Sequence, residues 1–393
     1  MGRIGKMIIS FFFMLVIVLF GSTTLIKAKG DIVESIKGNS IAEVPTAIDS
    51  AITSNFKSRN NWININGLAQ RVAGVTIIRD AGDIDVYKMT NGQLTYHYPD
   101  CDMLQPANEL TRVRDFANEC GAEMLYVQLP CKAYDDKLMP AGTHTYGYED
   151  ADELIKLLSK NQVKVLDIRK EIEEKGLDIS SLFFNTDHHW KPSTALWATE
   201  CIADQLSTMI EGYDYSKDIY NSENYNYSKY EEWFLGSLGR RTGMYFGGVD
   251  DYETLIPTFE TSFDLYTESQ TNGSVKTRSG SFEEALMRTG YLDKKDLFSE
   301  MTFFTYMGTE YRLSRVTNQK APNEKKVLMF RDSFSCPLLP FLALSAKEIT
   351  AVDLRYYDSF DVKECVINGD YDAVIVVYNP SMFREERAFE FEM

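Results

Sequence analysis

The 393-residue sequence has few histidines, few cysteines and no basic stripe. It contains six cysteines and four histidines, and no two cysteines have Cys-x-x-Cys spacing. That scatter disfavours a zinc ribbon and a disulfide-dense scaffold, although one or two disulfides remain open. Acidic residues outnumber basic ones by 58 to 41, which gives a formal net charge of −17. Without clustered cations to neutralise phosphates, we do not expect a nucleic-acid-binding protein.

Motifs for bound phosphate and metal are absent as well. The glycine-rich stretch 236–243 contains no Gly-Lys-Ser or Gly-Lys-Thr, so it does not predict a phosphate loop. No pair of histidines has the helical spacing of a zinc-binding motif. Asp187, His188 and His189 offer a metal-ligand alternative, which we disfavour because adjacent histidines rarely converge on one ion. We therefore expect neither a cofactor nor a metal.

Long apolar runs are scarce, and the clearest one opens the chain. Residues 7–26 are apolar and uncharged, and Arg3 and Lys6 precede them. This run is long enough to cross a bilayer as a helix, with the positive charge on the cytoplasmic side. Residues 26–28 fit the small-x-small rule of signal cleavage poorly, so residues 1–30 predict an uncleaved signal anchor rather than a cleaved signal peptide. With either, the rest of the chain is expected outside the cytoplasmic membrane.

The residues after position 30 divide into four stretches by their patterning. Helix-like and strand-like patterns alternate in 105–211 and again in 321–393, which is typical of a layered α/β domain with a mostly parallel sheet. Between them, 212–320 lacks clear periodicity and is interpreted as an inserted cap. The remaining stretch, 31–104, is interpreted as a stalk and a small β-rich segment, with strands expected at 61–67, 75–79, 85–88 and 94–96.

A serine occupies a promising place in the last stretch. Strands are expected at 326–330, 348–354 and 371–378, with helices between them. The loops after such strands gather at one edge of the sheet, where functional groups of open α/β folds are found. Ser333 follows the first of these strands and opens a helix. Its hydroxyl can therefore be exposed while nearby N–H groups form part of an oxyanion hole.

Asp187 and His189 supply the groups that a serine nucleophile needs. Histidine exchanges protons near neutrality, and a carboxylate can hold its tautomer and stabilise the imidazolium. The two residues stand at i and i+2, so in an extended segment both side chains emerge on one face and His188 points away. Taken alone, Ser333 is more simply explained as a helix N-cap, and the Asp187-His189 pair as two solvated loop residues. Their joint occurrence in one α/β pattern favours a catalytic triad.

The stretch Asp187-His188-His189-Trp190 resembles the signature of the DHHW family. The motif order is also similar to that of the SGNH-hydrolase-like proteins of alginate O-acetylation, in which an Asp-x-His-Trp stretch precedes the nucleophile serine. Ordinary SGNH hydrolases instead carry an Asp-x-x-His near the C-terminus. This resemblance, which covers roughly residues 105–393, implies a three-layer α/β sandwich with a permuted motif order. It also implies that Asp187, His189 and Ser333 form the triad.

Four further residues are candidates for binding substrate. Asn379 follows a strand where SGNH enzymes carry an asparagine that donates to the oxyanion, although the glycine and aspartate of that block are missing here. Arg355 either assists as a donor or pairs with Asp353. Arg240 and Arg241 belong to a glycine-rich segment that forms either a flap presenting cations or backbone N–H groups to substrate or, as we favour, a structural hairpin.

The resulting prediction is an extracytoplasmic O-acyltransferase. It would move an acyl group, most simply acetyl, onto a hydroxyl of a polysaccharide through an acyl-Ser333 intermediate. By resemblance, a multispanning membrane acyltransferase would supply the acyl group. A carbohydrate esterase with the same triad and a catalytically silent envelope binding or assembly protein are the alternatives. The tyrosines between 213 and 230 either stack on sugar rings or cover a cap surface.

Overall fold

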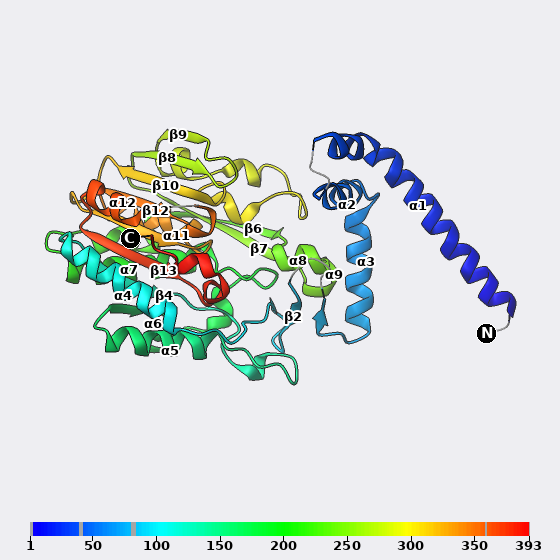
Figure 1. The fold of residues 1–393 in the computed structure, drawn as a ribbon, viewed down its shortest axis with the longest axis horizontal. Coiled ribbons are helices and arrows are strands. Elements are labelled where there is room, and N and C mark those ends of the chain that lie inside the picture. The colour runs from blue at the N-terminus through cyan, green and yellow to red at the C-terminus, as the bar shows by residue number, and fades with distance from the viewer. Residues whose placement is uncertain (1–2, 39–41, 80–83, 358–359, 393) are drawn as a thin grey trace. The chain divides into compact units, whose positions relative to one another are not determined.

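The structure, a computed structural model, describes residues 3–38, 42–79, 84–357 and 360–392. It divides into two compact units, residues 1–69 and residues 70–393. Figure 1 traces the chain from the N-terminal helices to the α/β domain.

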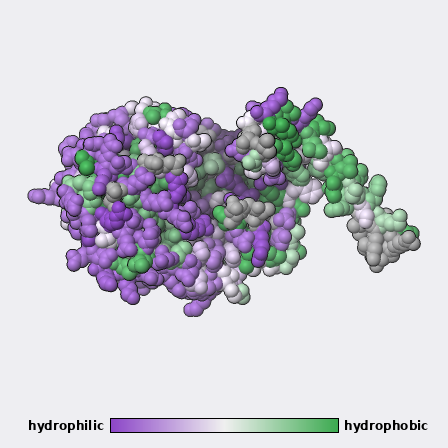
Figure 2. Space-filling view, in the orientation of Figure 1, coloured by the Kyte–Doolittle hydropathy of each residue, from purple (hydrophilic) through white to green (hydrophobic). Residues whose placement is uncertain are grey.

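The N-terminal unit is helical. It contains α1 (Arg3–Gly38), α2 (Val44–Ser54) and most of α3 (Arg59–Val72). Within α1, the part from Ser10 to Gly38 is long and apolar enough to cross a membrane. Figure 2 shows hydrophobic residues gathered along this helix. The expected N-terminal helix is therefore present, and its length and composition suit either a signal anchor or a signal peptide.

The prediction of a strand at 61–67 is wrong, because this segment belongs to helix α3. Isoleucines alternate with polar residues there, which imitates the period of a strand. The longer pattern has the helical spacing of three and four residues that places side chains on one helix face. The residues with this spacing are Trp62, Ile65, Leu68 and Val72.

The other strands of the N-terminal β-rich segment are present. They are β1 (Ile77–Ile78), β2 (Val86–Lys88) and β3 (Leu94–Thr95), which form an antiparallel sheet. Gly92 has a φ of 89° in the turn before β3, a conformation that glycine adopts without strain.

An eight-stranded mixed sheet forms the centre of the second unit, in the order β5-β4-β13-β11-β12-β10-β8-β9. The first five strands in this order are parallel, and the last three are antiparallel. The predicted mostly parallel sheet is thus confirmed. The strands are β4 (Glu123–Gln128), β5 (Lys164–Asp167), β8 (Phe263–Ser269), β9 (Val275–Gly280), β10 (Tyr311–Asn318), β11 (Lys326–Arg331), β12 (Glu348–Val352) and β13 (Ala373–Tyr378).

Helices cover both faces of this sheet, which makes three layers (Figure 1). One face packs against α4 (Leu104–Glu119), α5 (Gly147–Lys160) and α12 (Val362–Gly369), and the other against α6 (Ile168–Glu174), α7 (Pro192–Met209) and α11 (Ser335–Leu342). Each face of the sheet has its own hydrophobic core, and alternate residues of β11 point to opposite faces. Val327 and Met329 enter one core, and Leu328 and Phe330 enter the other. Burial on both faces explains why such strands are continuous apolar runs in the sequence.

Residues 212–320, interpreted as an inserted cap, contribute several regular strands. Strands β8, β9 and β10 from this segment extend the central sheet, and β6 (Tyr225–Phe234) pairs with β7 (Asp250–Pro257). In β8, Phe263 and Leu265 are buried while Asp264 between them is exposed. This half-buried alternation is typical of antiparallel strands and weaker as a signal than a continuous apolar run. The short helices here are α8 (Ser237–Thr242), α9 (Met244–Gly247) and α10 (Phe282–Leu286).

The tyrosines between 213 and 230 mostly belong to the core. Tyr213, Tyr220 and Tyr225 are buried. The hydroxyls of Tyr213 and Tyr220 lie 2.9 and 2.8 Å from Ser345 Oγ. These three tyrosines therefore do not present rings to a sugar.

Short 3-10 helices complete the described chain. They are η1 (Asp136–Leu138), η2 (Ile179–Leu182), η3 (Lys217–Tyr220), η4 (Ser222–Asn224), η5 (Thr289–Leu292), η6 (Thr302–Thr305), η7 (Leu354–Tyr356), η8 (Pro380–Arg384) and η9 (Glu386–Phe389).

Candidate active site

Ser333 lies between β11 and α11, at the carboxyl end of the parallel strands. It is half-buried, and Asp332 and Phe334 on either side are buried. The Phe334 amide donates a hydrogen bond to the Asp332 carboxylate at 2.9 Å, and the amides of the next two residues donate to backbone carbonyls. The Ser333 amide donates no hydrogen bond to any described residue. The loop therefore leaves an N–H group available beside the serine hydroxyl.

A line of short hydrogen bonds joins Asp187, His189 and Ser333. The Nδ1 atom of His189 is 2.6 Å from Asp187 Oδ1, and its Nε2 atom is 2.7 Å from Ser333 Oγ. An ionised carboxylate can only accept, so the Nδ1 atom carries the hydrogen and Nε2 is left to accept from the serine hydroxyl. The structure thus brings together the three residues predicted as a triad, in the arrangement that a general base requires.

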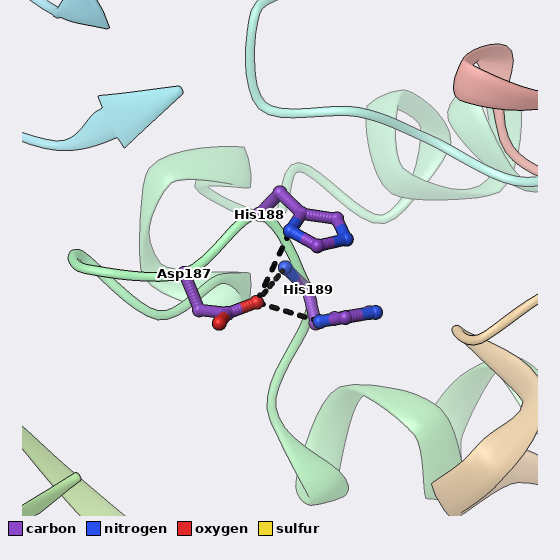
Figure 3. A group of neighbouring side chains, drawn as sticks. All are labelled: Asp187, His188 and His189. Carbon is purple, nitrogen blue, oxygen red and sulfur yellow. Dashed lines mark hydrogen bonds and ion pairs between the residues drawn. The ribbon is translucent and has the colours of Figure 1, made fainter. Parts of the chain in front are cut away.

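His188 does not point away from this line, contrary to the prediction from an extended segment. Its Nδ1 atom is 3.4 Å from Asp187 Oδ1, and its ring lies 3.8 Å from that of His189 (Figure 3). The segment is bent rather than extended, because the His189 amide turns back to donate a hydrogen bond to Asp187 Oδ1 at 3.0 Å. Burial and the neighbouring His189 hold the pKa of His188 well below its ordinary value.

The N-terminus of α8 fixes the Asp187 carboxylate from the other side. The Ser237 amide donates a hydrogen bond to Asp187 Oδ2 at 2.5 Å, and the Gly236 amide donates to Thr186 Oγ1 at 2.8 Å. Burial alone would raise the pKa of Asp187, but His189, His188 and the Ser237 amide hold it well below its ordinary value. The carboxylate is thus kept ionised.

Two glycines allow α8 to approach this closely. A Cβ atom on Gly236 would lie 2.3 Å from the Cβ of Asp187, and one on Gly239 would lie 2.8 Å from the Cβ of Thr186. Neither distance is possible for real side chains. The glycine-rich segment is therefore neither a flap nor a hairpin but a short helix pressed against the Asp187 turn.

Lys132 and Asp250 hold the turn that precedes His189, and the sequence reasoning missed both. The Lys132 ammonium donates hydrogen bonds to the carbonyls of Phe184, Asn185 and Asp187 at 2.8, 3.3 and 2.5 Å. The Asp250 carboxylate accepts from the amides of residues 185 and 186, each at 2.7 Å. Burial lowers the pKa of Lys132 to about 7 and raises that of Asp250. Lys132 lies in the loop after strand β4, as Ser333 lies in the loop after β11. This position after a parallel strand is the one sequence feature that could have identified Lys132 as part of the site.

Aromatic side chains enclose the His189 imidazole. Phe303 of η6 stacks on it with ring centroids 3.9 Å apart, and the centroid of the His188 ring is 3.8 Å away. Trp190 is fully buried, and its ring packs 5.5 Å from that of Phe334. Trp190 therefore packs in the core beside the serine loop.

Asn379 lies beside the serine loop, but Asp332 engages it. Both the backbone amide and the side-chain Nδ2 of Asn379 donate hydrogen bonds to Asp332 Oδ2, at 2.8 and 2.6 Å. Its Oδ1 accepts from the Ser381 amide at 2.9 Å and caps η8. One hydrogen of the Asn379 side-chain amide is thus used to hold Asp332. Its role as an oxyanion donor stays a prediction.

The three arginines differ in where they lie. Arg355 forms ion pairs with Asp353 at 2.7 Å and with Glu310 at 2.8 Å, so the pairing alternative is observed. Arg241 is exposed on α8. Arg240 is half-buried on α8 with Nη1 3.3 Å from Met301 Sδ, and it forms no ion pair with a described carboxylate. Burial lowers the pKa of Arg240, and Asp187 opposes that effect.

Asp187, His188 and His189 also lie close enough together to be considered as ligands of a metal ion. One donor atom each from Asp187, His188 and His189 lies within 4.8 Å of the others (Figure 3). However, Asp187 Oδ1 already accepts from His189 Nδ1, and His189 Nε2 already contacts the serine hydroxyl. A cation bound here would have to break these bonds. The arrangement fits proton transfer better than metal coordination.

Comparison with known protein families identifies a related domain in this chain. Residues 99–239 match a family described as "SGNH hydrolase-like domain, acetyltransferase AlgX". The resemblance drawn from the sequence is confirmed over this range. The matched residues include Asp187 and His189 and end before Ser333. No curated protein matches the sequence.

Solved structures share the fold. The chain is similar to Bacillus cereus PatB1 with a sulfonyl adduct, at 20% identity and a TM-score of 0.65 over 81% of this chain and 98% of that one. It is also similar to a DHHW family protein from Eubacterium siraeum, at 16% identity and a TM-score of 0.56 over 80% of this chain and 96% of that one. The domain therefore has the SGNH-like α/β fold.

Proposed function

We propose that the protein is an extracytoplasmic O-acyltransferase that moves an acyl group, most simply acetyl, onto a polysaccharide hydroxyl. The observation that carries this proposal is the hydrogen-bonded line from Asp187 through His189 to Ser333, with distances of 2.6 and 2.7 Å. The match of residues 99–239 to an acetyltransferase-like SGNH domain supports acyl transfer as the reaction.

In the first half-reaction, Ser333 Oγ attacks the carbonyl carbon of the acyl donor. His189 Nε2 takes the hydroxyl proton, and the ionised Asp187 stabilises the imidazolium that forms. The C–O bond to the leaving group then breaks, and Nε2 gives the proton to that group. This leaves an acyl-Ser333 ester. The Ser333 amide, which donates to no described residue, is available to donate to the negative oxygen that develops on the carbonyl.

In the second half-reaction, an acceptor hydroxyl takes the place of the leaving group. His189 removes its proton as the oxygen attacks the ester carbon, and Ser333 Oγ recovers that proton when its ester bond breaks. Arg240, half-buried on α8 beside the site and without a carboxylate partner among the described residues, is the best candidate to contact the acceptor or donor.

The apolar part of α1 would tether the domain to the outer face of the cytoplasmic membrane. There is no cytosolic acyl-coenzyme A on that side. A multispanning membrane acyltransferase would therefore deliver the acyl group, and the acceptor would be a polysaccharide of the cell envelope or its surroundings.

The test uses the full chain in detergent with 4-nitrophenyl acetate as donor, in the presence and absence of mixed oligosaccharides. We expect an acetyl mass increase on the peptide containing Ser333, and acetylated sugar when acceptor is present. Acetate release without acetylated sugar would indicate a carbohydrate esterase instead. No turnover and no adduct would favour a catalytically silent envelope protein.

A further inference from the structure

A groove separate from the triad opens at the carboxyl end of β5. Its volume is about 630 Å³, which lies within the range of ligand sites. None of its residues belongs to the triad or to the turn that supports it. Its lining includes Tyr134, Tyr148, Asp152, Asp167, Arg169 and Glu173.

The groove lies on the same edge of the sheet as Ser333. Asp167 of β5 pairs with Gln128 of β4, which pairs with Tyr378 of β13, and β13 in turn neighbours β11. Three strand spacings therefore separate Asp167 from the strand that leads to Ser333, which is about 14 Å. A group bound in the groove is too far away to react at Ser333. One sugar unit of a polymer can lie in the groove while another unit of the same chain lies at Ser333.

A rigid polar pair forms one wall. The Arg169 guanidinium is only 7% exposed and binds the Asp167 carboxylate through two hydrogen bonds of 2.9 Å. A third bond of 2.7 Å joins it to Asp152, and a fourth of 3.2 Å joins its Nη1 atom to the Tyr148 carbonyl, which leaves one of its five N–H groups for a ligand. Bidentate pairs of this kind hold their remaining donors and acceptors in fixed directions. Such groups suit the hydroxyls of a sugar, which both donate and accept.

Aromatic rings form the adjoining wall. The Arg169 guanidinium lies 4.7 Å from the ring centroid of Tyr148, and the Tyr134 ring lies 6.1 Å from that of Tyr148. Tyr134 is 38% exposed and lines the groove, so a ligand can reach part of this residue. An exposed tyrosine ring offers an apolar face together with a polar edge, which matches the C–H face and hydroxyl rim of a sugar ring.

The charge of the groove decides between classes of glycan. Its lining contains the four carboxylates Asp152, Asp167, Glu173 and Asp178 against the two cations Arg169 and Lys170. An excess of negative charge repels a polyuronate or a phosphorylated glycan. A neutral sugar chain meets no such repulsion.

We propose that this groove is a remote subsite for an uncharged stretch of the polysaccharide acceptor, with Tyr134 as its stacking platform. The proposal rests on the proposed function, because it names the class of acceptor that the same enzyme would modify. Binding energy from a remote unit can hold the reacting hydroxyl at the serine.

The experiment measures calorimetric binding of hexasaccharides to the full chain in detergent. The neutral probes are cellohexaose, maltohexaose and the hexamer of N-acetylglucosamine, and the anionic probe is hexagalacturonate. We expect at least one neutral probe to bind tenfold or more tightly than hexagalacturonate. Tyr134→Ala should weaken that binding at least tenfold. The matched control is Tyr245→Ala, since Tyr245 is 48% exposed on α9 and outside the groove, and it should bind as the wild type does.

A second variant tests the charge argument. Glu173→Lys should tighten hexagalacturonate binding at least threefold, since Glu173 is exposed in the groove. The subsite is refuted if no neutral probe binds, if hexagalacturonate binds best to the wild type, or if the two tyrosine variants bind equally. Hydrolysis of 4-nitrophenyl acetate by the wild type is measured separately. If the wild type binds a neutral hexasaccharide through Tyr134 but does not hydrolyse 4-nitrophenyl acetate, the proposed reaction is refuted and the proposed subsite is not.

Discussion

The indole nitrogen of Trp190 donates a hydrogen bond to the backbone carbonyl of Phe334 at 2.9 Å. Trp190 follows His189, and Phe334 follows Ser333, so this bond joins the two loops that carry the base and the serine. The two residues are 144 positions apart in the chain. Trp190 therefore sets the distance between the loops as well as filling space between them.

Trp190→Phe should keep most of the packing and lose this hydrogen bond. A neutral hydrogen bond contributes about 1 kcal/mol, so kcat for 4-nitrophenyl acetate should fall roughly fivefold while KM changes little. Steady-state kinetics and a thermal unfolding curve measured on the same preparation check this. A variant with unchanged kcat would show that the bond does not hold the loops in register.

Ser333→Ala and His189→Ala should each lower turnover by orders of magnitude, on the scale seen when triad members are removed from other enzymes. Both side chains lie at a loop, so we expect unchanged circular dichroism. Acetyl incorporation at residue 333 and kcat are the two readouts. Wild-type turnover in either variant would exclude the triad.

His188→Ala should retain turnover within about tenfold of the wild type, in contrast to His189→Ala. His188 contacts the carboxylate only at 3.4 Å, whereas Nε2 of His189 is 2.7 Å from the serine hydroxyl. Parallel kinetics on the two variants decide the matter. Loss of activity in His188→Ala alone would transfer the role of base to that residue.

The three residues that the structure brings together, Asp187, His189 and Ser333, could be chosen from the sequence because each belongs to a local pattern. Ser333 directly follows a continuous apolar strand, and Asp187 and His189 stand two positions apart in a short motif. The rule that loops after parallel strands share one edge then brings the two segments together. The reason given for choosing His189 was nevertheless wrong, because the backbone bends at Asp187 rather than running extended.

The supports of the triad could not be predicted in the same way. Lys132 lies more than 50 positions from the carbonyls that it binds, and Asp250 lies 64 and 65 positions from its amides. Such contacts depend on tertiary packing and leave no periodic trace. The helix α3 was missed for another reason, since a short alternation of isoleucine and asparagine fits both periods until a longer window is compared.

Gly236→Ala should lower kcat at least tenfold. The added Cβ would meet the Cβ of Asp187 at 2.3 Å, so α8 must move and withdraw the Ser237 amide from the carboxylate. Gly290→Ala is the matched control, because Gly290 is exposed and the nearest atom to its added Cβ is 3.8 Å away. Equal kcat in the two variants would show that the α8 contact is dispensable.

Lys132→Met should change how stability depends on pH. The native pKa of Lys132 is about 7, because burial disfavours the ammonium, whereas an unfolded lysine titrates near its ordinary value of about 10.4. Between these two values the unfolded chain holds a proton that the native chain has lost, so wild-type stability gains up to about 1.4 kcal/mol per pH unit from this group. Below pH 7 both states are protonated and this gain is absent.

The methionine variant has no such group, so its stability should not show this rise. It should also be less stable throughout, since the carbonyls of residues 184, 185 and 187 lose their shared donor. Thermal unfolding midpoints measured from pH 6 to pH 10 give both the overall loss of stability and its dependence on pH. We expect the gap between wild type and variant to widen as the pH rises above 7, and two parallel curves would mean that Lys132 keeps its proton in the fold.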